Sequence, residues 1–292
     1  MANNDTVLIT GATGTVGRAV LDHLTTAEVD VRVTTRDEAK ARSLQDRGVD
    51  AVVADLLQPY SLRPALKGVS VVFLVTPISP QQVVHASNLL QAAKESGNVR
   101  RIVRLSVQKA SHAAPTRVGR QHAEIDDALA SSGVAYTILR PQSFMQNTLM
   151  AATTVAAEST IYQPVRHARL GMIDARDVGE VAARVLTEDG HDGKVYTLTG
   201  PATLSFDEVA CTLTEVLGKE VRYVDVPLEA AKQAMLRRGV PEWLADALNE
   251  YARAHSEGYS DYTTVDFERL TGRAATPFAQ FAQDFQHVFR GG

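Results

Sequence analysis

The stretch Val7-Leu8-Ile9-Thr10-Gly11-Ala12-Thr13-Gly14-Thr15-Val16-Gly17 decides the fold of this chain. A short apolar run ends at three glycines spaced three apart. A helical pattern then begins at once, with Val16, Ala19, Val20 and Leu24 on one face. A strand that turns through glycines into a helix is the arrangement that holds phosphates in the first βα unit of a dinucleotide fold. The stretch therefore predicts a nucleotide site where the first strand ends.

Each glycine of this stretch has a separate expected task. Gly11 lets the chain turn sharply out of the strand, Gly14 lets the backbone approach a pyrophosphate, and Gly17 lets the helix pack closely. The start of the helix offers free N–H groups to the anion. We therefore also expect contacts to the cofactor from Thr13, Thr15 and Val16. The alternative is a plain structural turn, since glycine loops also arise without ligands.

Composition narrows the class of protein. The chain has 292 residues, 45% hydrophobic and 22% charged, which is ordinary for a globular protein. Its 30 basic and 34 acidic side chains give a net charge of −4, so we expect no general nucleic-acid binding. The single cysteine, Cys211, excludes an internal disulfide, and we expect it to pack in the core. The opening residues resemble no leader and no apolar run is long enough to span a membrane, so we expect a cytoplasmic protein.

Strand-like and helix-like segments alternate through the first half, which predicts a doubly wound parallel sheet of the Rossmann type. The second half is less regular and predicts a smaller α/β lobe. We expect a dinucleotide-binding domain at 1–147 and a substrate-binding lobe at 148–292, with the chain crossing between them. The expected strands are 6–10, 29–34, 51–53, 69–75, 101–106, 136–139, 170–173, 195–198 and 221–224. The expected helices are 15–27, 38–47, 61–66, 80–96, 117–132, 176–187, 205–217, 228–238, 241–254 and 277–289.

The end of the second strand points to the cofactor. A fold selective for NAD commonly places an acid there to bind the ribose 2′-hydroxyl. Here the strand ends in Val33-Thr34-Thr35-Arg36, and Arg36 offers a planar cation suited to a 2′-phosphate. Asp37 is expected to cap the next helix. We therefore predict NADP, with NAD as the alternative; an arginine that merely faces solvent is the competing interpretation of Arg36.

Two further pairs follow strands and so fall at the same edge of the sheet. Asp55-Leu56 follows the third strand and is expected to flank the adenine ring. Thr76-Pro77 follows the fourth and is expected to line the path toward the nicotinamide. Either pair could instead be a loop with polar caps.

With these residues in hand, the sequence resembles the NmrA-like group of atypical short-chain dehydrogenases/reductases, nearest to quinone reductases and triphenylmethane-dye reductases. The resemblance covers nearly the whole chain. Its most specific segments, beyond the glycine loop, are Ser132-Gly133-Val134-Ala135-Tyr136-Thr137-Ile138-Leu139-Arg140-Pro141-Gln142-Ser143-Phe144-Met145-Gln146-Asn147, Met172-Ile173-Asp174-Ala175-Arg176-Asp177-Val178 and Tyr196-Thr197-Leu198-Thr199-Gly200-Pro201.

The resemblance implies the catalytic candidates. Ser106 takes the place of the serine that follows the fifth strand in short-chain dehydrogenases, and His122 takes the place of their lysine. Val118 stands where the tyrosine acid would be. His122 and Asp126 are four apart, so a helix brings them onto one face. A structural histidine that simply pairs with Asp126 is the competing interpretation of His122. The resemblance also implies that Pro141 and Phe144 join Ser106 and His122 around the cofactor.

The missing tyrosine limits the reaction. Reducing a ketone produces an alkoxide that needs a strong acid, whereas reducing a quinone produces a phenolate, with a pKa of about 10 like that of tyrosine. Water or a histidine can protonate it. We therefore predict an NAD(P)H-dependent oxidoreductase, NADPH preferred, that reduces a quinone-like or other conjugated small molecule. Phe144, Met145 and Tyr162, with Pro77, are candidates for the slot that holds the acceptor, and packing between the two lobes is the competing interpretation of Phe144 and Met145.

A second function class stays open. The same fold could be a redox sensor that binds NADP without turnover, as NmrA-like regulators do. Val118 favours sensing, whereas Ser106 and His122 favour chemistry. A sugar-nucleotide epimerase is disfavoured because it would need the tyrosine–lysine pair. We expect no metal, no nucleic-acid partner and no membrane partner; the sequence does not fix the oligomeric state, and a homodimer is one option.

Overall fold

A computed structural model describes residues 5–292; residues 1–4, which form most of the opening segment considered above, lie outside the described residues. Its main feature is a seven-stranded sheet with the order β3-β2-β1-β4-β5-β6-β8. Every pairing from β3 across to β6 is parallel. The strands are β1 (Thr6–Ile9), β2 (Val31–Thr35), β3 (Asp50–Val53), β4 (Val69–Leu74), β5 (Arg101–Leu105), β6 (Ala135–Pro141) and β8 (Lys194–Leu198).

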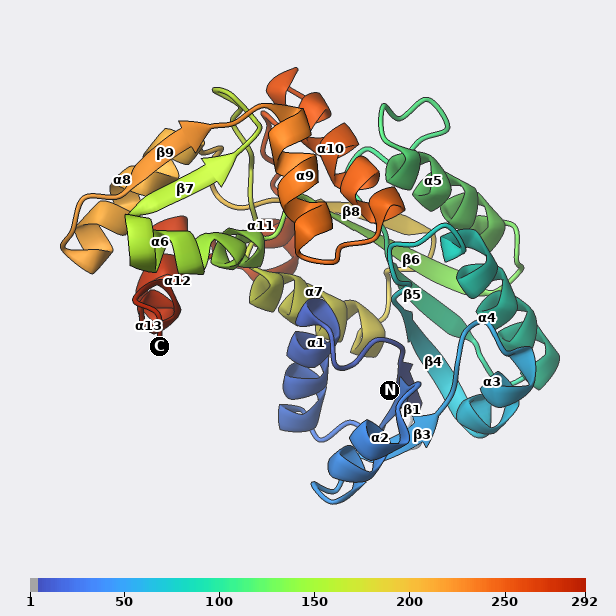
Figure 1. Ribbon diagram of the computed structural model, residues 1–292. Coiled ribbons are helices and arrows are strands. Elements are labelled where there is room, and N and C mark those ends of the chain that lie inside the picture. Colours follow the sequence, from blue (N-terminus) through green and yellow to red (C-terminus); the bar gives the residue numbers. More distant parts are fainter. Residues whose placement is uncertain (1–4) are drawn as a thin grey trace. The chain divides into compact units, whose positions relative to one another are not determined.

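Helices cover both faces of this sheet (Figure 1). On one face, apolar side chains of α3, α4 and α5 pack against strands β1, β4, β5 and β6. On the other face, α1 and α7 are in contact, because a Cβ on Gly179 would meet Ala19 at 2.6 Å. The doubly wound fold expected from the alternating pattern is therefore confirmed. The helices are α1 (Thr15–Thr26), α2 (Glu38–Gln45), α3 (Pro59–Leu66), α4 (Gln82–Ser96), α5 (Arg117–Ala130) and α7 (Ala175–Thr187).

The strand order reverses at β1 and β4, and this topological switch point sets where a ligand binds. From β1 the chain moves outward through β2 to β3, and then returns to the other side of β1 with β4 and β5. In open parallel sheets ligands bind beyond the carboxyl ends of the strands at this point. Residues that directly follow β1 to β5 are therefore the ones that form the candidate site.

The chain divides into two compact units. Unit 1 contains residues 1–113, 119–140 and 178–196, and unit 2 contains residues 114–118, 141–177 and 197–292. The chain thus passes between the units several times, and α5 begins in unit 2 and continues in unit 1.

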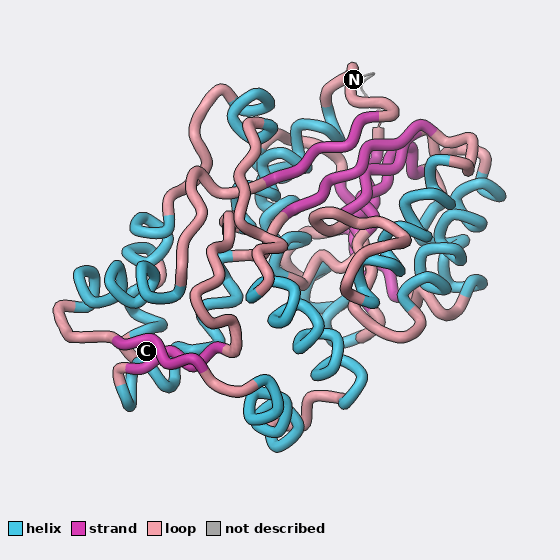
Figure 2. The backbone as a smooth tube through the Cα atoms, turned by 90° about the horizontal axis from the view of Figure 1, so that it is seen from above, coloured by secondary structure: helices cyan, strands magenta, loops and turns pink. Residues whose placement is uncertain are grey.

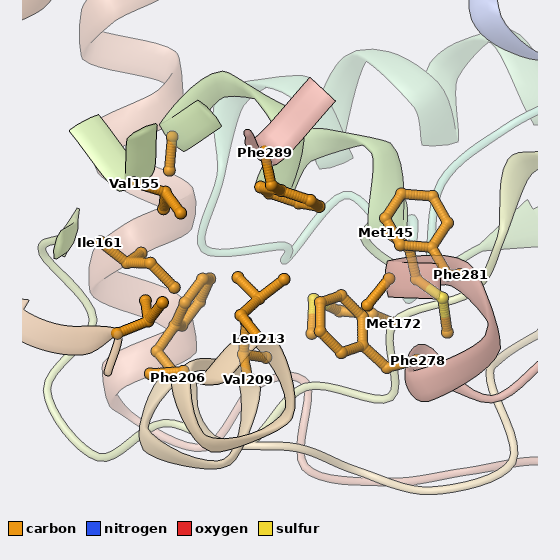
Figure 3. Packing of buried hydrophobic residues seen from close by; sticks show 14 of the residues in the cluster. Met145, Val155, Ile161, Met172, Phe206, Val209, Leu213, Phe278, Phe281 and Phe289 are labelled. Atoms are coloured by element: carbon orange, nitrogen blue, oxygen red, sulfur yellow. The ribbon is translucent and has the colours of Figure 1, made fainter. Parts of the chain in front are cut away.

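Unit 2 has its own small sheet and its own core. Strands β7 (Thr160–Gln163) and β9 (Arg222–Asp225) pair in parallel as a separate ribbon (Figure 2). Its core is rich in phenylalanine and methionine (Figure 3). The remaining helices are the 3₁₀ helix η1 (Met145–Ala151), α6 (Ala152–Glu158), α8 (Phe206–Leu217), α9 (Leu228–Arg237), α10 (Glu242–Ser256), α11 (Asp266–Thr271), α12 (Phe278–Asp284) and α13 (Gln286–Phe289).

Local capping follows the sequence in two places. The Asp37 carboxylate accepts from the backbone N–H groups of Ala39 and Lys40, so it caps α2 as expected. Ser205 and Glu208 form a capping box at the start of α8. Both caps satisfy N–H groups that have no acceptor within their helix.

Three local expectations were wrong. Residues 170–173 form only isolated bridges, Leu170 with Leu204 and Ile173 with Phe144, instead of a strand. The helix expected at 277–289 is interrupted at Phe285, so that α12 and α13 are separate helices. Cys211 is exposed, because α8 turns the neighbouring Ala210 and Leu213 inward instead.

Within residues 5–292, none of the helices combines the length and the apolar character that crossing a membrane requires.

Candidate dinucleotide and active site

The glycine turn leaves the start of α1 open. The Gly14 N–H donates to the Gly11 carbonyl at 2.9 Å, which closes the turn, and Gly11 adopts a φ of +67° that favours glycine. Helix α1 begins at Thr15 with Gly14 as its cap residue, so no side chain covers its first N–H groups, and no acid lies in its first turn. The first N–H groups of a helix have no acceptor of their own and carry partial positive charge.

The shape of this turn fits a pyrophosphate. A Cβ on Gly17 would lie 2.2 Å from the Gly11 carbonyl oxygen, so the helix can approach the turn only with glycine there. A Cβ on Gly14 would lie 3.2 Å from the same oxygen and would occupy the space over the helix start. The three glycines thus keep backbone N–H groups accessible, and Thr13, Thr15 and Val16 lie on the same turn. A dinucleotide therefore fits the residues present.

Arg36 is free to bind an anion. It directly follows β2, is exposed, and forms no ion pair with any residue in the range 5–292. The neighbouring acid, Asp37, is committed to the α2 cap and does not neutralise it. An unpaired, planar guanidinium at this edge of the sheet suits a 2′-phosphate.

Asp55 and Leu56 form a tight turn after β3. The Asp55 carboxylate accepts from the Leu57 N–H at 2.9 Å, and Asn88 of α4 donates to the Leu56 carbonyl at 2.8 Å. His85, one turn earlier on α4, is buried, and its Nδ1 has no partner in the described chain. Burial lowers the pKa of His85; Asp55 opposes this effect and Arg36 adds to it, so all three lie in one neighbourhood.

Thr76 and Pro77 follow β4 at the switch point. Thr76 is buried and its hydroxyl is hydrogen-bonded to the Gln82 side-chain amide at 3.1 Å, whereas Pro77 is exposed. The Thr10 hydroxyl donates to the Val75 carbonyl at 2.8 Å, which ties the ends of β1 and β4 together. This part of the edge is therefore held firmly by side chains on both strands.

A buried network of charged and polar groups lies beyond β5. At its centre, Asp126 of α5 accepts from Arg104 of β5 through Oδ1, and from Arg140 of β6 through Oδ2 at 2.9 Å. The Ser106 hydroxyl donates to the same Oδ2 at 2.9 Å. Arg104 is 0% exposed, and burial lowers its pKa to about 10, so it remains charged at neutral pH.

His122 belongs to the same network, but not as the partner of Asp126. Its Nδ1 lies 3.0 Å from Arg104 Nη2, and its Nε2 lies 2.8 Å from the amide of Gln82. Since a guanidinium can only donate, Nδ1 accepts and the imidazole proton is on Nε2. The Gln82 Oε1 has no partner in the described chain, so turning this amide brings an acceptor to the Nε2 proton.

The environment keeps His122 neutral. Burial holds its pKa well below the usual 6.5, and the positive charges of Arg104 and Arg140 add to this effect. Its side chain is only 6% exposed. His122 thus fixes the positions of its neighbours, and its proton points to Gln82 in this arrangement.

Four expected site residues lie in unit 2. Pro141, at the end of β6, is buried, and Phe144 is half-buried and bridges to Ile173. Met145 is 1% exposed and lies among Met172, Phe278 and Phe281 in the core (Figure 3). Tyr162 is 41% exposed, and its hydroxyl donates to Glu158 at 2.8 Å. Met145 thus packs within the core of unit 2.

Three members of the network were not singled out from the sequence: Arg104, Gln82 and Arg140. A lone arginine inside the apolar strand Ile102-Val103-Arg104-Leu105 is a signal that could have been noticed, because a buried charge requires a partner. Gln82 gave no such signal. Arg140 lies in a segment that matches the family, and its contact with Asp126 depends on how β6 pairs with β5.

A second matching segment, Met172 to Val178, contributes two carboxylates, Asp174 and Asp177, to unit 2. The fully buried Asp174 binds Arg176 at 2.6 Å and Gln146 at 2.7 Å. Asp177 accepts from Arg273 at 2.7 Å and from the Thr276 N–H at 2.6 Å. These carboxylates join distant parts of the unit, so this segment is structural.

A Rossmann-type sheet with an uncapped glycine turn, a free arginine after β2 and a polar network after β5 defines a dinucleotide-binding protein of the short-chain dehydrogenase type. Residues 3–278 match the NmrA-like family, and the chain belongs to that family.

Related proteins are similar in sequence to this chain over almost its full length. An NAD(P)H azoreductase of Xenophilus azovorans is 40% identical over 283 residues, covering 97% of this chain and 99% of the relative. Quinone oxidoreductase 2 of Escherichia coli is 30% identical, covering 97% and 98%.

Two solved structures are also similar to the structure of this chain. The Escherichia coli NADPH-dependent quinone oxidoreductase complexed with NADPH is 29% identical with a TM-score of 0.86, covering 97% of this chain and 99% of that chain. The Citrobacter sp. triphenylmethane reductase complexed with NADP(H) is 28% identical with a TM-score of 0.85, covering 96% and 99%.

Proposed function

We propose that this protein is an NADPH-dependent oxidoreductase that transfers hydride to a flat, conjugated small molecule such as a quinone. The observation that carries the proposal is the edge of the unit 1 sheet, where an open helix start, a free Arg36 and the Ser106 network follow β1, β2 and β5. Relatives whose names state NAD(P)H-dependent azo and quinone reduction support it.

The residues proposed to hold the cofactor are those of unit 1 at this edge. Backbone N–H groups of the glycine turn would hold the pyrophosphate, Arg36 the 2′-phosphate, and Asp55 with Leu56 the adenine. Thr76, Pro77, Ser106 and His122 would line the nicotinamide end, and Pro141 and Phe144 complete the expected set. When bound, NADPH supplies the hydride.

We propose that Ser106 and His122 serve this reaction by positioning. The Ser106 proton is directed to Asp126, and the His122 proton is directed to Gln82. Neither group is arranged as an acid toward a substrate, and Val118 stands where short-chain dehydrogenases have a tyrosine acid. Holding a reduced ring against a flat acceptor lowers the barrier by orientation, and the phenolate product is basic enough for water to protonate.

We propose that apolar side-chain surfaces hold the acceptor. Pro77 and Phe144 offer them, Met145 would support Phe144 from within the core, and Tyr162 is exposed on β7. Unit 1 is thus the proposed cofactor unit, and unit 2 the proposed substrate unit. We place the reaction in the cytoplasm; a homodimer remains a prediction, which light scattering of the purified protein would test.

The test is direct. Purified protein is titrated with NADPH, NADH and NADP⁺ by calorimetry, and NADPH oxidation is then followed at 340 nm with a panel of quinones and azo dyes. We expect binding with NADPH preferred, and turnover with at least one acceptor. Absence of binding to every nicotinamide coenzyme would refute the proposal. Tight NADP⁺ binding without turnover would favour the redox sensor instead, which the missing tyrosine at Val118 already makes the second candidate.

A further inference from the structure

We propose that Arg140 is a catalytic residue of this site, whose guanidinium stabilises the negative charge that hydride transfer creates on the acceptor. The inference rests on the proposed function and deepens it. For a quinone, the hydride adds to one carbonyl oxygen as the C4–H bond of the dihydronicotinamide breaks and that ring is oxidised. The electrons of the quinone shift to the opposite oxygen, which becomes a phenolate and then takes a proton from water, leaving hydroxide.

The charges of the buried network do not balance. Two guanidinium groups, Arg104 and Arg140, face a single carboxylate, Asp126. Within residues 5–292, neither arginine has another carboxylate at ion-pair distance. His122 adds no charge because it is neutral, and Gln82, from α4, is uncharged. The network therefore carries one positive charge in excess, and a buried charge without a counter-ion is costly unless it meets an anion in function.

Arg140 is the member of the network that a substrate can reach. Its side chain is 25% exposed, whereas that of Arg104 is 0% exposed. Its Nε and Nη2 both donate to Asp126 Oδ2, at 3.2 and 2.9 Å. These two hydrogen bonds fix one edge of the guanidinium, and Nη1 on the opposite edge has no partner among the described residues. The free edge is thus aimed by a carboxylate that is itself fixed by Arg104.

Arg140 also lies at the reacting end of the site. Ser106, directly after β5, and Arg140 Nη2 each lie 2.9 Å from the same oxygen of Asp126. The two groups are therefore separated by no more than twice this distance. Since the Ser106 and His122 protons are used inside the network, Arg140 is the remaining cationic donor there. A preorganised cation aimed at developing negative charge is among the most effective catalytic devices.

The decisive experiment uses 4-nitrophenol as a probe of the product anion, because its phenolate absorbs visible light. The probe is titrated with pH in the presence of NADP⁺ and an excess of wild-type protein or of one variant, and its apparent pKa is read from the absorbance. We expect the wild-type protein to lower this pKa by about 1, which corresponds to tenfold tighter binding of the anion than of the phenol. Arg140→Met should abolish the effect, and Arg140→Lys should keep part of it.

The matched control is Arg63→Met, which removes an exposed arginine of the same unit that pairs with Glu95. It should behave as wild type. In turnover, Arg140→Met should lower kcat for a quinone about 100-fold, with NADP⁺ affinity measured by calorimetry unchanged. Circular dichroism and NADP⁺ binding establish that each variant is folded, and Arg140→Lys serves if Arg140→Met is not.

The possible results distinguish the role of Arg140 from the proposed reductase function. If wild-type protein reduces quinones but does not shift the pKa of the probe, or if Arg140→Met retains both the shift and kcat, the role of Arg140 is refuted and the reductase function stands. If wild-type protein binds no nicotinamide coenzyme, the proposed function itself fails.

Discussion

Two regions at the same edge of the unit 1 sheet use hydrogen-bond donors in opposite ways. The glycine turn and Arg36 leave their donors free: α1 starts without a side-chain cap, and Arg36 has no ion pair within the described chain. The network around Asp126 uses most of its donors in internal hydrogen bonds, and Arg104 and Asp126 are buried. The first region leaves several donors free to bind an anion, whereas the second holds a fixed geometry in which Arg140 is the charged group that is partly exposed.

This difference predicts whether a mutation in each region affects ligand binding or stability. A change in the open region should reduce ligand binding at little cost in stability, unless it blocks the backbone. A change in the closed region should reduce stability first, because it leaves a buried polar group without a partner.

Gly17→Val should abolish dinucleotide binding and lower stability by several kcal/mol. Even a Cβ at this position would lie 2.2 Å from the Gly11 carbonyl oxygen and 2.8 Å from its carbon, and backbone cannot move aside cheaply. Calorimetry with NADP⁺ and thermal unfolding measure the two losses. Gly97→Ala is the control, since its Cβ would meet nothing within 4 Å and only its φ of +67° adds a cost of about 1–2 kcal/mol. Wild-type affinity in Gly17→Val would contradict the geometry of the turn.

Arg104→Leu should lower the free energy of unfolding by about 3–5 kcal/mol, because it removes one partner of a buried ion pair and one donor to His122. Urea unfolding measures this change. The control, Arg42→Leu, removes an exposed arginine paired with Glu38 and should cost less than about 1 kcal/mol. Equal costs for the two variants would mean that the network does not stabilise the fold.

Arg36→Ala should weaken NADPH binding about 10- to 100-fold and NADH binding hardly at all, because charge-assisted hydrogen bonds contribute about 1.5–3 kcal/mol. Unfolding in urea should be almost unchanged, since Arg36 is exposed and forms no ion pair in residues 5–292. Calorimetric titrations of both coenzymes decide the matter. Equal losses for NADPH and NADH would show that Arg36 does not bind the 2′-phosphate.

The smallest expected effect is a dependence of the free energy of unfolding on pH. Burial lowers the pKa of His255 in unit 2 to about 4, and that of His122 well below 6.5. In the unfolded chain both histidines take up protons near pH 6.5, whereas in the native protein they do not. Stability is therefore fully present above pH 6.5 and falls as pH drops below it, by up to about 1.4 kcal/mol per pH unit and histidine.

The measurement compares urea unfolding at pH 7 and pH 5 for wild type and His255→Asn. The variant should lose less stability between the two pH values, because its asparagine does not titrate. His112→Asn is the control, since His112 is exposed and pairs with Asp127 at the surface. A variant as sensitive to pH as wild type would show that His255 is not the group concerned.

Local sequence determined the parts of this protein that depend on neighbouring residues. The glycine turn, the strand before it and the helix after it follow from backbone freedom and apolar spacing, so the sheet and the shape of this turn could be predicted. The Asp37 and Ser205 caps likewise involve only groups two or three residues away.

Only the tertiary structure decided the partners of side chains that meet from separate strands and helices. The helix spacing suggested that Asp126 would pair with His122, but Arg104 and Arg140 from β5 and β6 occupy that carboxylate instead. Cys211 became exposed, and Met145 entered a core, through the orientation of their helices. These outcomes depend on contacts between residues distant in the chain, which spacing along the sequence does not encode.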